Sequence, residues 1–170
     1  SGGFLLYALN KVRNKATGLY PNYAKDVRQH DRWFKYWHDF AEKNLYGIEI
    51  SEQISRAAKM NMIIHDDGHT NVITSDGLVS DETIIAKTNN QGFKYGTFDF
   101  IITNPPFGST VRQSEQAYLK TYQLGKKEED WLAVATPSQN TRDGQSTEVL
   151  FIEQDYKFLK EGGYLAIVLP

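Results

Sequence analysis

Short apolar runs alternate with longer amphipathic segments along the chain, and this alternation constrains the fold more than any other feature of the sequence. Each run is five or six residues long, which is short for a helix and ordinary for a buried strand. The segments between the runs carry apolar residues at helical spacing. Strands that alternate with helices favour a parallel sheet with helices on both faces. The four predicted strands are residues 45–50, 71–75, 98–103 and 164–169.

The first part of the chain predicts helices from apolar and aromatic periodicity. Residues 4–12 present one apolar face, and Gly18 and Pro21 should end that helix. The aromatic-rich stretch 24–43 predicts one or two further helices. Its large rings are spaced as a helical stripe, so we expect them to pack in a core rather than to bind a ligand; they are Trp33, Phe34, Trp37 and Phe40.

Two later helices are marked by serine caps. Ser51 is predicted to cap a helix over 52–64, and Ser146 one over 147–160 that Gly162-Gly163 should stop. In the first of these helices, the residues expected to face inward are Ile54, Ala57, Ala58 and Met62. In the second, they are Val149, Ile152, Tyr156 and Leu159.

Composition restricts the classes of protein to which the chain can belong. At 170 residues, with 40% hydrophobic and 24% charged residues, it can bury a sizeable core as a soluble globular protein. The net charge of −2 does not indicate a nucleic-acid binder, so such a partner would need a local basic patch or another domain. The absence of cysteine excludes disulfides and cysteine-based zinc sites, and fits a cytoplasmic protein. No apolar run approaches the roughly 18–20 residues of a membrane span.

The segment Asn104-Pro105-Pro106-Phe107 is the strongest candidate for a reactive site. Two successive prolines cannot continue a central strand, so the strand before them must end here. The Asn104 side-chain oxygen and the Pro105 carbonyl can then accept both N–H groups of an exocyclic amine, which turns the nitrogen lone pair toward an incoming methyl group. Phe107 offers a flat face on which a flipped-out base could stack. We therefore expect these four residues to form a catalytic site for amino methylation.

Five further residues are candidates for cofactor binding. Gly2 and Gly3 permit a close backbone approach, and the helix after them would direct its N–H groups at a ligand. Glu49, at a strand end, could accept both hydroxyls of a ribose, and Ile50 could pack on an adenine ring. Asp76 could accept a hydrogen bond from the adenine amino group. Ordinary interpretations also remain open. Gly2 and Gly3 could be loop glycines, Glu49 a solvated acid, and Asp76 part of a Ser-Asp-Gly turn.

Several motifs together resemble one family. The chain is similar to the modification (M) subunit of type I restriction-modification systems, within the adenine-N6 DNA methyltransferases. The resemblance covers residues 1–170 outside irregular excursions at about 15–43, 78–96 and 108–145. It rests on Ser1-Gly2-Gly3-Phe4, on Asn44-Leu45-Tyr46-Gly47-Ile48-Glu49-Ile50, on Asn104 to Phe107, and on residues 147–153 and 163–170.

The resemblance implies a fold and an activity. It implies one Rossmann-like class I S-adenosylmethionine-dependent methyltransferase domain over residues 1–170. In such a domain Ser1, Gly2 and Gly3 would contact the methionine part of S-adenosylmethionine, and the target would be adenine in double-stranded DNA. The implied partners are the specificity (S) and restriction (R) subunits of the same system. No metal is implied, and His65-Asp66-Asp67-Gly68-His69 is expected to be a helix end rather than a metal site.

The family pattern also extends beyond both ends of the chain. It places an acidic residue, a proline and a glycine just before Ser1, after a central strand, and it continues with further strands beyond Pro170. We therefore expect a fragment that binds the cofactor poorly and is inactive alone. Open strand edges would favour its self-association.

Alternative functions remain open from the residues alone. An Asn-Pro-Pro-aromatic site could also serve another planar amine or amide, such as cytosine N4, an RNA guanine or a protein glutamine. A non-catalytic binding module on the same fold is a second alternative. Basic residues after the motif could contact DNA phosphates or lie in a solvated loop; they are Lys120, Lys126, Lys127 and Arg142.

Overall fold

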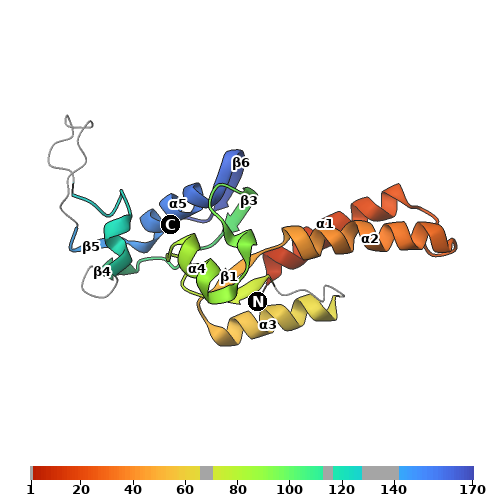
Figure 1. Ribbon diagram of the computed structural model, residues 1–170, viewed down its shortest axis with the longest axis horizontal. Coiled ribbons are helices and arrows are strands. Elements are labelled where there is room, and N and C mark those ends of the chain that lie inside the picture. Colours follow the sequence, from red (N-terminus) through yellow and green to blue (C-terminus); the bar gives the residue numbers. More distant parts are fainter. Residues whose placement is uncertain (1, 66–70, 113–116, 128–141) are drawn as a thin grey trace. The chain divides into compact units, whose positions relative to one another are not determined.

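The computed structural model describes residues 2–65, 71–112, 117–127 and 142–170 (Figure 1). The chain divides into two compact units, Ser1–Asp76 and Gly77–Pro170. Each unit is mixed α/β and has its own two-stranded parallel sheet. The expected α/β class is confirmed, but among the described residues the four predicted strands form two separate pairs rather than one sheet. The single domain expected over the whole chain stays a prediction. Among the described residues, no helix combines the length and hydropathy needed to cross a membrane.

The first unit is a helical hairpin followed by a strand–helix–strand unit. Helices α1 (Gly3–Leu19) and α2 (Val27–Asn44) pack side by side (Figure 1). Strands β1 (Gly47–Glu49) and β2 (Val72–Thr74) then pair in parallel, with α3 (Glu52–Ile64) between them in the chain. The Ser51 hydroxyl accepts a hydrogen bond from the Ile54 N–H at 3.4 Å, which confirms the predicted cap and the bounds of α3.

An aromatic cluster forms the core of this unit. Trp37 is 1% exposed and contacts the edge of Trp33, whose ring stacks on Tyr23 with centroids 4.5 Å apart. The Arg13 guanidinium lies over the Trp37 ring at 4.0 Å. The aromatic stripe is thus packing, as expected, although Phe34 is 40% exposed. The fully buried members of this core are Leu9, Ala16, Trp37, Ala41 and Met62.

Two expectations for the first unit are wrong. Residues 15–43 as a whole are not the irregular excursion that was expected, because they are mostly helical. The expected end of the first helix near Gly18 and Pro21 is confirmed at Leu19, and the helix expected within 24–43 is confirmed as α2. In α3, Ile54 and Ala57 are exposed, whereas Ala58 and Met62 are buried as expected.

The second unit contains the second parallel pair. Strand β3 (Phe98–Thr103) pairs in parallel with β6 (Leu159–Ile167), which follows helix α5 (Thr147–Phe158). The bounds of β3 are those predicted, because the prolines stop it. Strand β6 begins earlier than predicted: the register shifts between Phe98 and Phe100, and Gly162 adopts the left-handed conformation (φ 76°) inside the strand.

The segments expected to be irregular in this unit contain regular elements. Residues 78–96 include helix α4 (Asp81–Thr88) and the 3-10 helix η1 (Gln91–Phe93). The Ser80 hydroxyl caps α4, and Ile84 and Phe93 are buried, so this excursion is part of the core. Residues 108–145 contain the short helix η2 (Ala117–Thr121), and strand β4 (Thr110–Arg112) pairs antiparallel with β5 (Gly144–Ser146).

Helix α5 buries a different face from the one predicted. Ile152 and Tyr156 are exposed, whereas Leu150, Gln154 and Phe158 are buried. Polar side chains point inward on this helix because they bind loop backbone.

Gln154 and Glu153 make the contacts that determine this face. The Gln154 amide donates to the carbonyls of Gly77 (2.9 Å) and Val79 (2.8 Å), and its oxygen accepts from the Tyr95 hydroxyl at 3.0 Å. The Glu153 carboxylate accepts the N–H groups of Gln123 (2.9 Å) and Leu124 (2.8 Å). Burial raises the pKa of Glu153, but hydrogen bonds from Lys157, Leu124 and Gln123 outweigh it and lower the pKa overall.

We predict that Gln154→Ala destabilises the protein by about 3 kcal/mol, since it leaves two backbone carbonyls and a tyrosine hydroxyl without their partner. Urea unfolding followed by circular dichroism measures this change. Gln53→Ala, at an exposed position of α3, is the control and should change stability by less than about 0.5 kcal/mol. Equal effects of the two substitutions would contradict the role given to Gln154.

Asp155 should make stability depend on pH. Burial raises its pKa from 3.8 to about 7, and Oδ2 has no hydrogen-bond partner among the described residues. Between pH 3.8 and 7 the folded state therefore holds a proton that the unfolded state has lost, so this group's contribution to stability falls as the pH rises through that window.

Asp155→Asn removes this titration. We predict that the unfolding free energy of the variant relative to the wild type increases from pH 4 to pH 8, measured by urea unfolding across that range. Glu161→Gln, at an exposed position of β6, is the control and should not show the trend. A difference between Asp155→Asn and the wild type that stays constant with pH would contradict the prediction.

Candidate functional site

The predicted catalytic motif directly follows the carboxyl end of β3. The strand ends at Thr103, and Asn104, Pro105 and Pro106 continue without regular secondary structure. Pro105 is buried, whereas Asn104 and Pro106 are exposed and Phe107 is 49% exposed. The motif therefore has a buried proline at its centre and an amide and an aromatic ring that are accessible to a ligand.

The loop after the motif is held by the first turn of α5. The Gly108 N–H donates to the Glu148 carboxylate at 2.7 Å, and the Ser146 hydroxyl donates to the other carboxylate oxygen. The Ser109 carbonyl accepts from the N–H of Thr147 at 3.0 Å and from its hydroxyl at 2.9 Å. Gly108 has a φ of 68°, a left-handed conformation that favours glycine. These contacts fix the backbone immediately after Phe107.

Glu148 is charged at neutral pH. The hydrogen bond from the Ser146 hydroxyl lowers the pKa of Glu148, the N–H groups of Glu148 itself and of Gly108 lower it further, and burial opposes them. A carboxylate in the first turn also interacts favourably with the helix dipole. The anchoring role of Glu148 is not predicted by the sequence. An acid in a first turn predicts dipole stabilisation, but it does not reveal that the side chain binds a distant loop.

The N-terminus of α1 carries the predicted glycine pair. Gly2 has a φ of 76°, and a Cβ added to it would lie 3.2 Å from the Cβ of Ala58, so the turn requires glycine. Gly3 begins α1, and among the described residues no side chain makes a capping hydrogen bond to the helix. The first N–H groups of the helix therefore have no capping side chain to compete with a polar ligand. Ser1 lies outside the described residues.

Glu49 and Asp76 follow neighbouring strands of the same sheet. Glu49 pairs with Thr74, the last residue of β2, and its carbonyl accepts the N–H of Ser75 at 3.1 Å. The two strands therefore end level, and Asp76 follows two residues later. One Glu49 carboxylate oxygen accepts the N–H of Ser51 at 3.0 Å, which gives this side chain a structural role at the start of α3. A carboxylate has further lone pairs for a ligand.

These residues fit a nucleoside cofactor. The first unit combines an uncapped helix N-terminus, a left-handed glycine and two acids at the carboxyl ends of adjacent parallel strands. Ile50, next to Glu49, is 71% exposed and could cover a planar ring. The described cofactor candidates thus belong to the first unit, and the candidate catalytic motif belongs to the second.

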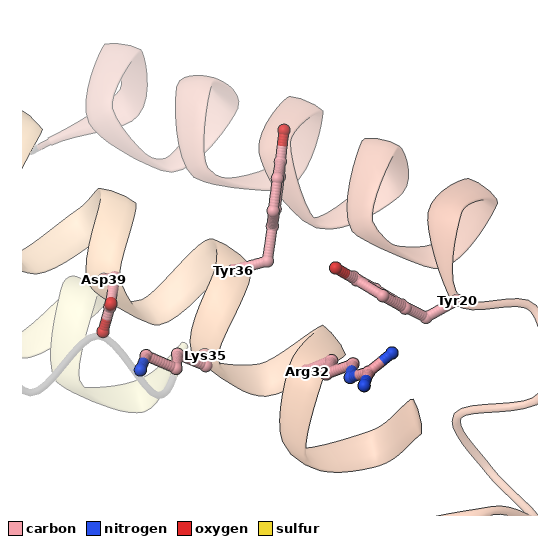
Figure 2. A pocket seen from close by; sticks show the side chains of 5 residues that line it. All are labelled: Tyr20, Arg32, Lys35, Tyr36 and Asp39. Atoms are coloured by element: carbon pink, nitrogen blue, oxygen red, sulfur yellow. The ribbon is translucent and has the colours of Figure 1, made fainter. Parts of the chain in front are cut away.

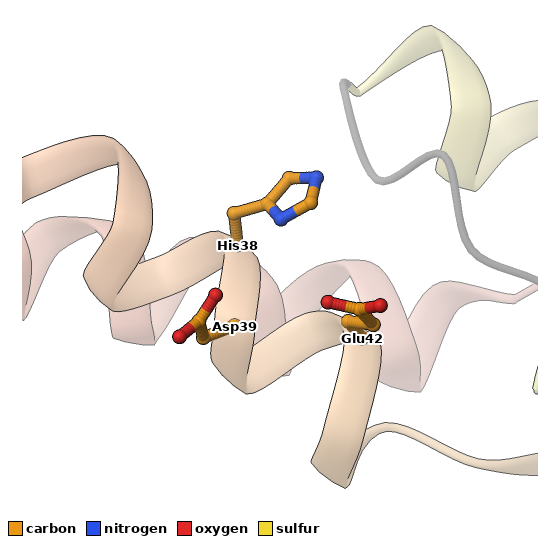
Figure 3. A group of neighbouring side chains, drawn as sticks. All are labelled: His38, Asp39 and Glu42. Atoms are coloured by element: carbon orange, nitrogen blue, oxygen red, sulfur yellow. The ribbon is translucent and has the colours of Figure 1, made fainter. Parts of the chain in front are cut away.

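One group of side chains has a composition that could bind a metal. His38, Asp39 and Glu42 of α2 offer ligand atoms that lie within 4.8 Å of one another (Figure 3). The Asp39 carboxylate, however, already pairs with Lys43 at 3.5 Å, and the three residues come from little more than one turn of a single helix. We assign no metal to them. Of the segment His65 to His69, only His65 is described, and its carbonyl accepts a hydrogen bond from Arg13.

The basic residues after the motif have mostly local contacts. The Arg142 side chain donates to the Lys126 carbonyl at 3.0 Å, and Lys127 lies 3.9 Å from the Asp143 carboxylate. Lys120 is exposed at η2. Arg142 therefore has a structural role in its loop, and a phosphate contact by the other residues stays a prediction.

We predict that Glu148→Ala accelerates hydrogen exchange of the Gly108 amide by roughly tenfold or more, because the amide loses its acceptor. Exchange followed by mass spectrometry of peptides from 104–112 measures this change. Glu82→Ala removes an exposed first-turn acid of α4 and should leave exchange in the same peptides unaltered. Unchanged exchange in Glu148→Ala would show that the anchor is dispensable.

Comparison with known proteins adds independent information. The model of the family described as N-6 DNA methylase matches residues 1–170. A type II restriction enzyme and methyltransferase, RM.BcgI of Heyndrickxia coagulans, is 25% identical over 170 residues. The match covers 100% of this chain and 19% of that relative, so the chain spans about a fifth of the length of the curated relative it matches. No solved structure matches the chain.

Proposed function

Because the chain belongs to the N-6 DNA methylase family, we propose that it is the catalytic part of a site-specific adenine-N6 DNA methyltransferase. The substrate is an adenine flipped out of double-stranded DNA, and the methyl donor is S-adenosylmethionine. The observation that carries the proposal is the motif Asn104-Pro105-Pro106-Phe107, which directly follows the carboxyl end of a parallel strand and lies before a loop anchored to α5.

The motif acts through two hydrogen-bond acceptors and a stacking surface. The Asn104 side-chain oxygen and the Pro105 carbonyl accept the two N–H groups of the adenine amine, so that the nitrogen lone pair points away from the ring plane. Phe107 stacks on the base after it leaves the duplex. The prolines restrict the backbone and thereby orient the acceptors before the substrate arrives.

The first unit holds the cofactor in this proposal. Gly2 and Gly3 bring the α1 N–H groups close to its methionine part, Glu49 binds the ribose hydroxyls, and Ile50 and Asp76 contact the adenine. When bound, S-adenosylmethionine supplies an activated methyl group on a sulfonium, so no residue of the chain has to act as a strong base.

Glu148 and Thr147 contribute through position rather than contact with the substrate. Their bonds to Gly108 and Ser109 hold the segment that follows Phe107. A catalytic group that is oriented in advance loses less entropy when the substrate binds. We infer that these residues limit the motion of the acceptors in the motif.

The biological setting follows from the same family. We propose that the protein is the modification subunit of a type I restriction-modification system in the cytoplasm, and that specificity (S) and restriction (R) subunits are its partners. The relative RM.BcgI combines restriction and methyltransferase functions by name, which supports a restriction-modification setting. Base recognition would then belong to the specificity subunit.

We predict that Asn104→Ala, made in the full-length protein assembled with its partner subunits, lowers methyl transfer to DNA by at least roughly 100-fold, because one oriented acceptor is lost. The assay follows labelled methyl groups from S-adenosylmethionine into duplex DNA and identifies the methylated base after digestion. Asn10→Ala, at an exposed position of α1, is the matched control and should retain full activity.

The same assay separates the alternatives. Label found in N4-methylcytosine would show that cytosine, not adenine, is the target. Transfer to RNA or protein in place of DNA would show that one of these is the substrate. Undiminished transfer by Asn104→Ala would refute a catalytic role for the motif.

A further inference from the structure

A pocket of about 340 Å³ lies on the helical hairpin of the first unit, and none of its lining residues belongs to the cofactor or catalytic candidates. Tyr20 follows the end of α1, and the other four lining residues belong to α2 (Figure 2). The lining contains two cations, two phenols and one acid; it consists of Tyr20, Arg32, Lys35, Tyr36 and Asp39.

The hairpin that bears this pocket is the basic part of the chain. Residues 3–44 contain eight Lys and Arg against four Asp and Glu, a net charge of +4. The rest of the chain therefore carries −6, since the total is −2. The net charge of the whole chain, which does not indicate a nucleic-acid binder, therefore does not reveal the local excess of positive charge on the hairpin.

The lining of the pocket has a net positive charge, because two cations outnumber the single carboxylate of Asp39. The Asp26 side chain accepts the N–H groups of Arg28 and Gln29 as the cap of α2, and Asp39 pairs with Lys43 at 3.5 Å. Among the described residues, no carboxylate forms an ion pair with Arg32 or Lys35. Both cations are therefore available to an anionic ligand.

The cations also form one continuous stripe. Arg28, Arg32 and Lys35 are spaced by four and three residues, so they follow one face of α2, and all three are exposed. Trp37 and Ala41 of the same helix are buried in the core of the unit, which fixes which side of α2 packs inward.

We propose that this pocket binds a backbone phosphate of duplex DNA. The proposal rests on the proposed function, because it takes DNA as the substrate. Arginine, lysine and tyrosine side chains are common donors to DNA phosphates, and such contacts position a protein on the duplex without reading its sequence. The stripe from Arg28 to Lys35 would follow the strand beyond the pocket.

The occupant is a macromolecular anion rather than a small one. The Asp39 carboxylate in the lining disfavours a lone phosphate, whereas the repeated charges of a DNA strand can also engage Arg28 beyond the pocket. Counterion release on binding then adds affinity for each phosphate neutralised. An acidic protein surface offers no comparable regular spacing.

The test is the affinity of the protein for duplex DNA as a function of salt concentration. Arg32→Gln combined with Lys35→Gln should weaken binding by roughly tenfold at low salt, and should reduce the slope of log Kd against log salt concentration by about 1 to 2. The loss should be equal on specific and unrelated duplexes, because phosphates carry no sequence information.

Two control variants make the result specific. Lys87→Gln combined with Lys94→Gln removes the same charge from exposed positions of the second unit and should bind DNA as the wild type does. Arg32→Lys combined with Lys35→Arg keeps the charge and should retain most of the affinity and the wild-type salt slope.

The outcomes separate this inference from the proposed function. The phosphate site alone would be overturned by two results together. The protein with Arg32→Gln and Lys35→Gln would bind DNA with wild-type affinity and salt slope, and the wild type would methylate DNA. Lack of both DNA binding and DNA methylation by the wild-type full-length protein with its partner subunits would overturn the site together with the proposed function.

Discussion

The hydrogen bonds between the inward face of α5 and the loops around it are the interactions on which the second unit depends. Glu148, Glu153 and Gln154 of α5 are buried, and each binds backbone groups of a segment that is distant in sequence. Buried polar side chains are costly unless every group finds a partner, so these contacts specify one arrangement of the loops. The segment after the candidate catalytic motif is one of the loops held by these contacts.

The fold could be predicted from sequence where the signals are local. Ser51 caps α3 through its own side chain, and the two prolines after Thr103 end β3, so both elements have the bounds that were predicted. The inward face of α5 could not be predicted in this way. Its polarity reflects partners far along the chain, and periodicity alone favoured the apolar residues Ile152 and Tyr156, which are exposed.

The residues of the candidate site also differ in whether they could be predicted from local sequence signals. A proline pair, a glycine pair and an acid after a strand are visible in the sequence because each imposes a local backbone requirement. The anchoring role of Glu148 is visible only in the structure, because its contact with Gly108 joins two elements about forty residues apart in the chain. The positive charge of the α1–α2 hairpin was present in the sequence but was averaged out in the net charge.

The topology of the two parallel pairs affects how the chain folds. β1 and β2 are separated in the chain by little more than one helix, so the first unit needs only a short chain closure. β3 cannot pair until β6 has been made, and β6 comes after the whole segment from the candidate catalytic motif to the end of α5. Long-range closures form slowly, so during synthesis the first unit would complete while β3 still exposed an unsatisfied edge. Chaperone protection at this stage would serve mainly the second unit.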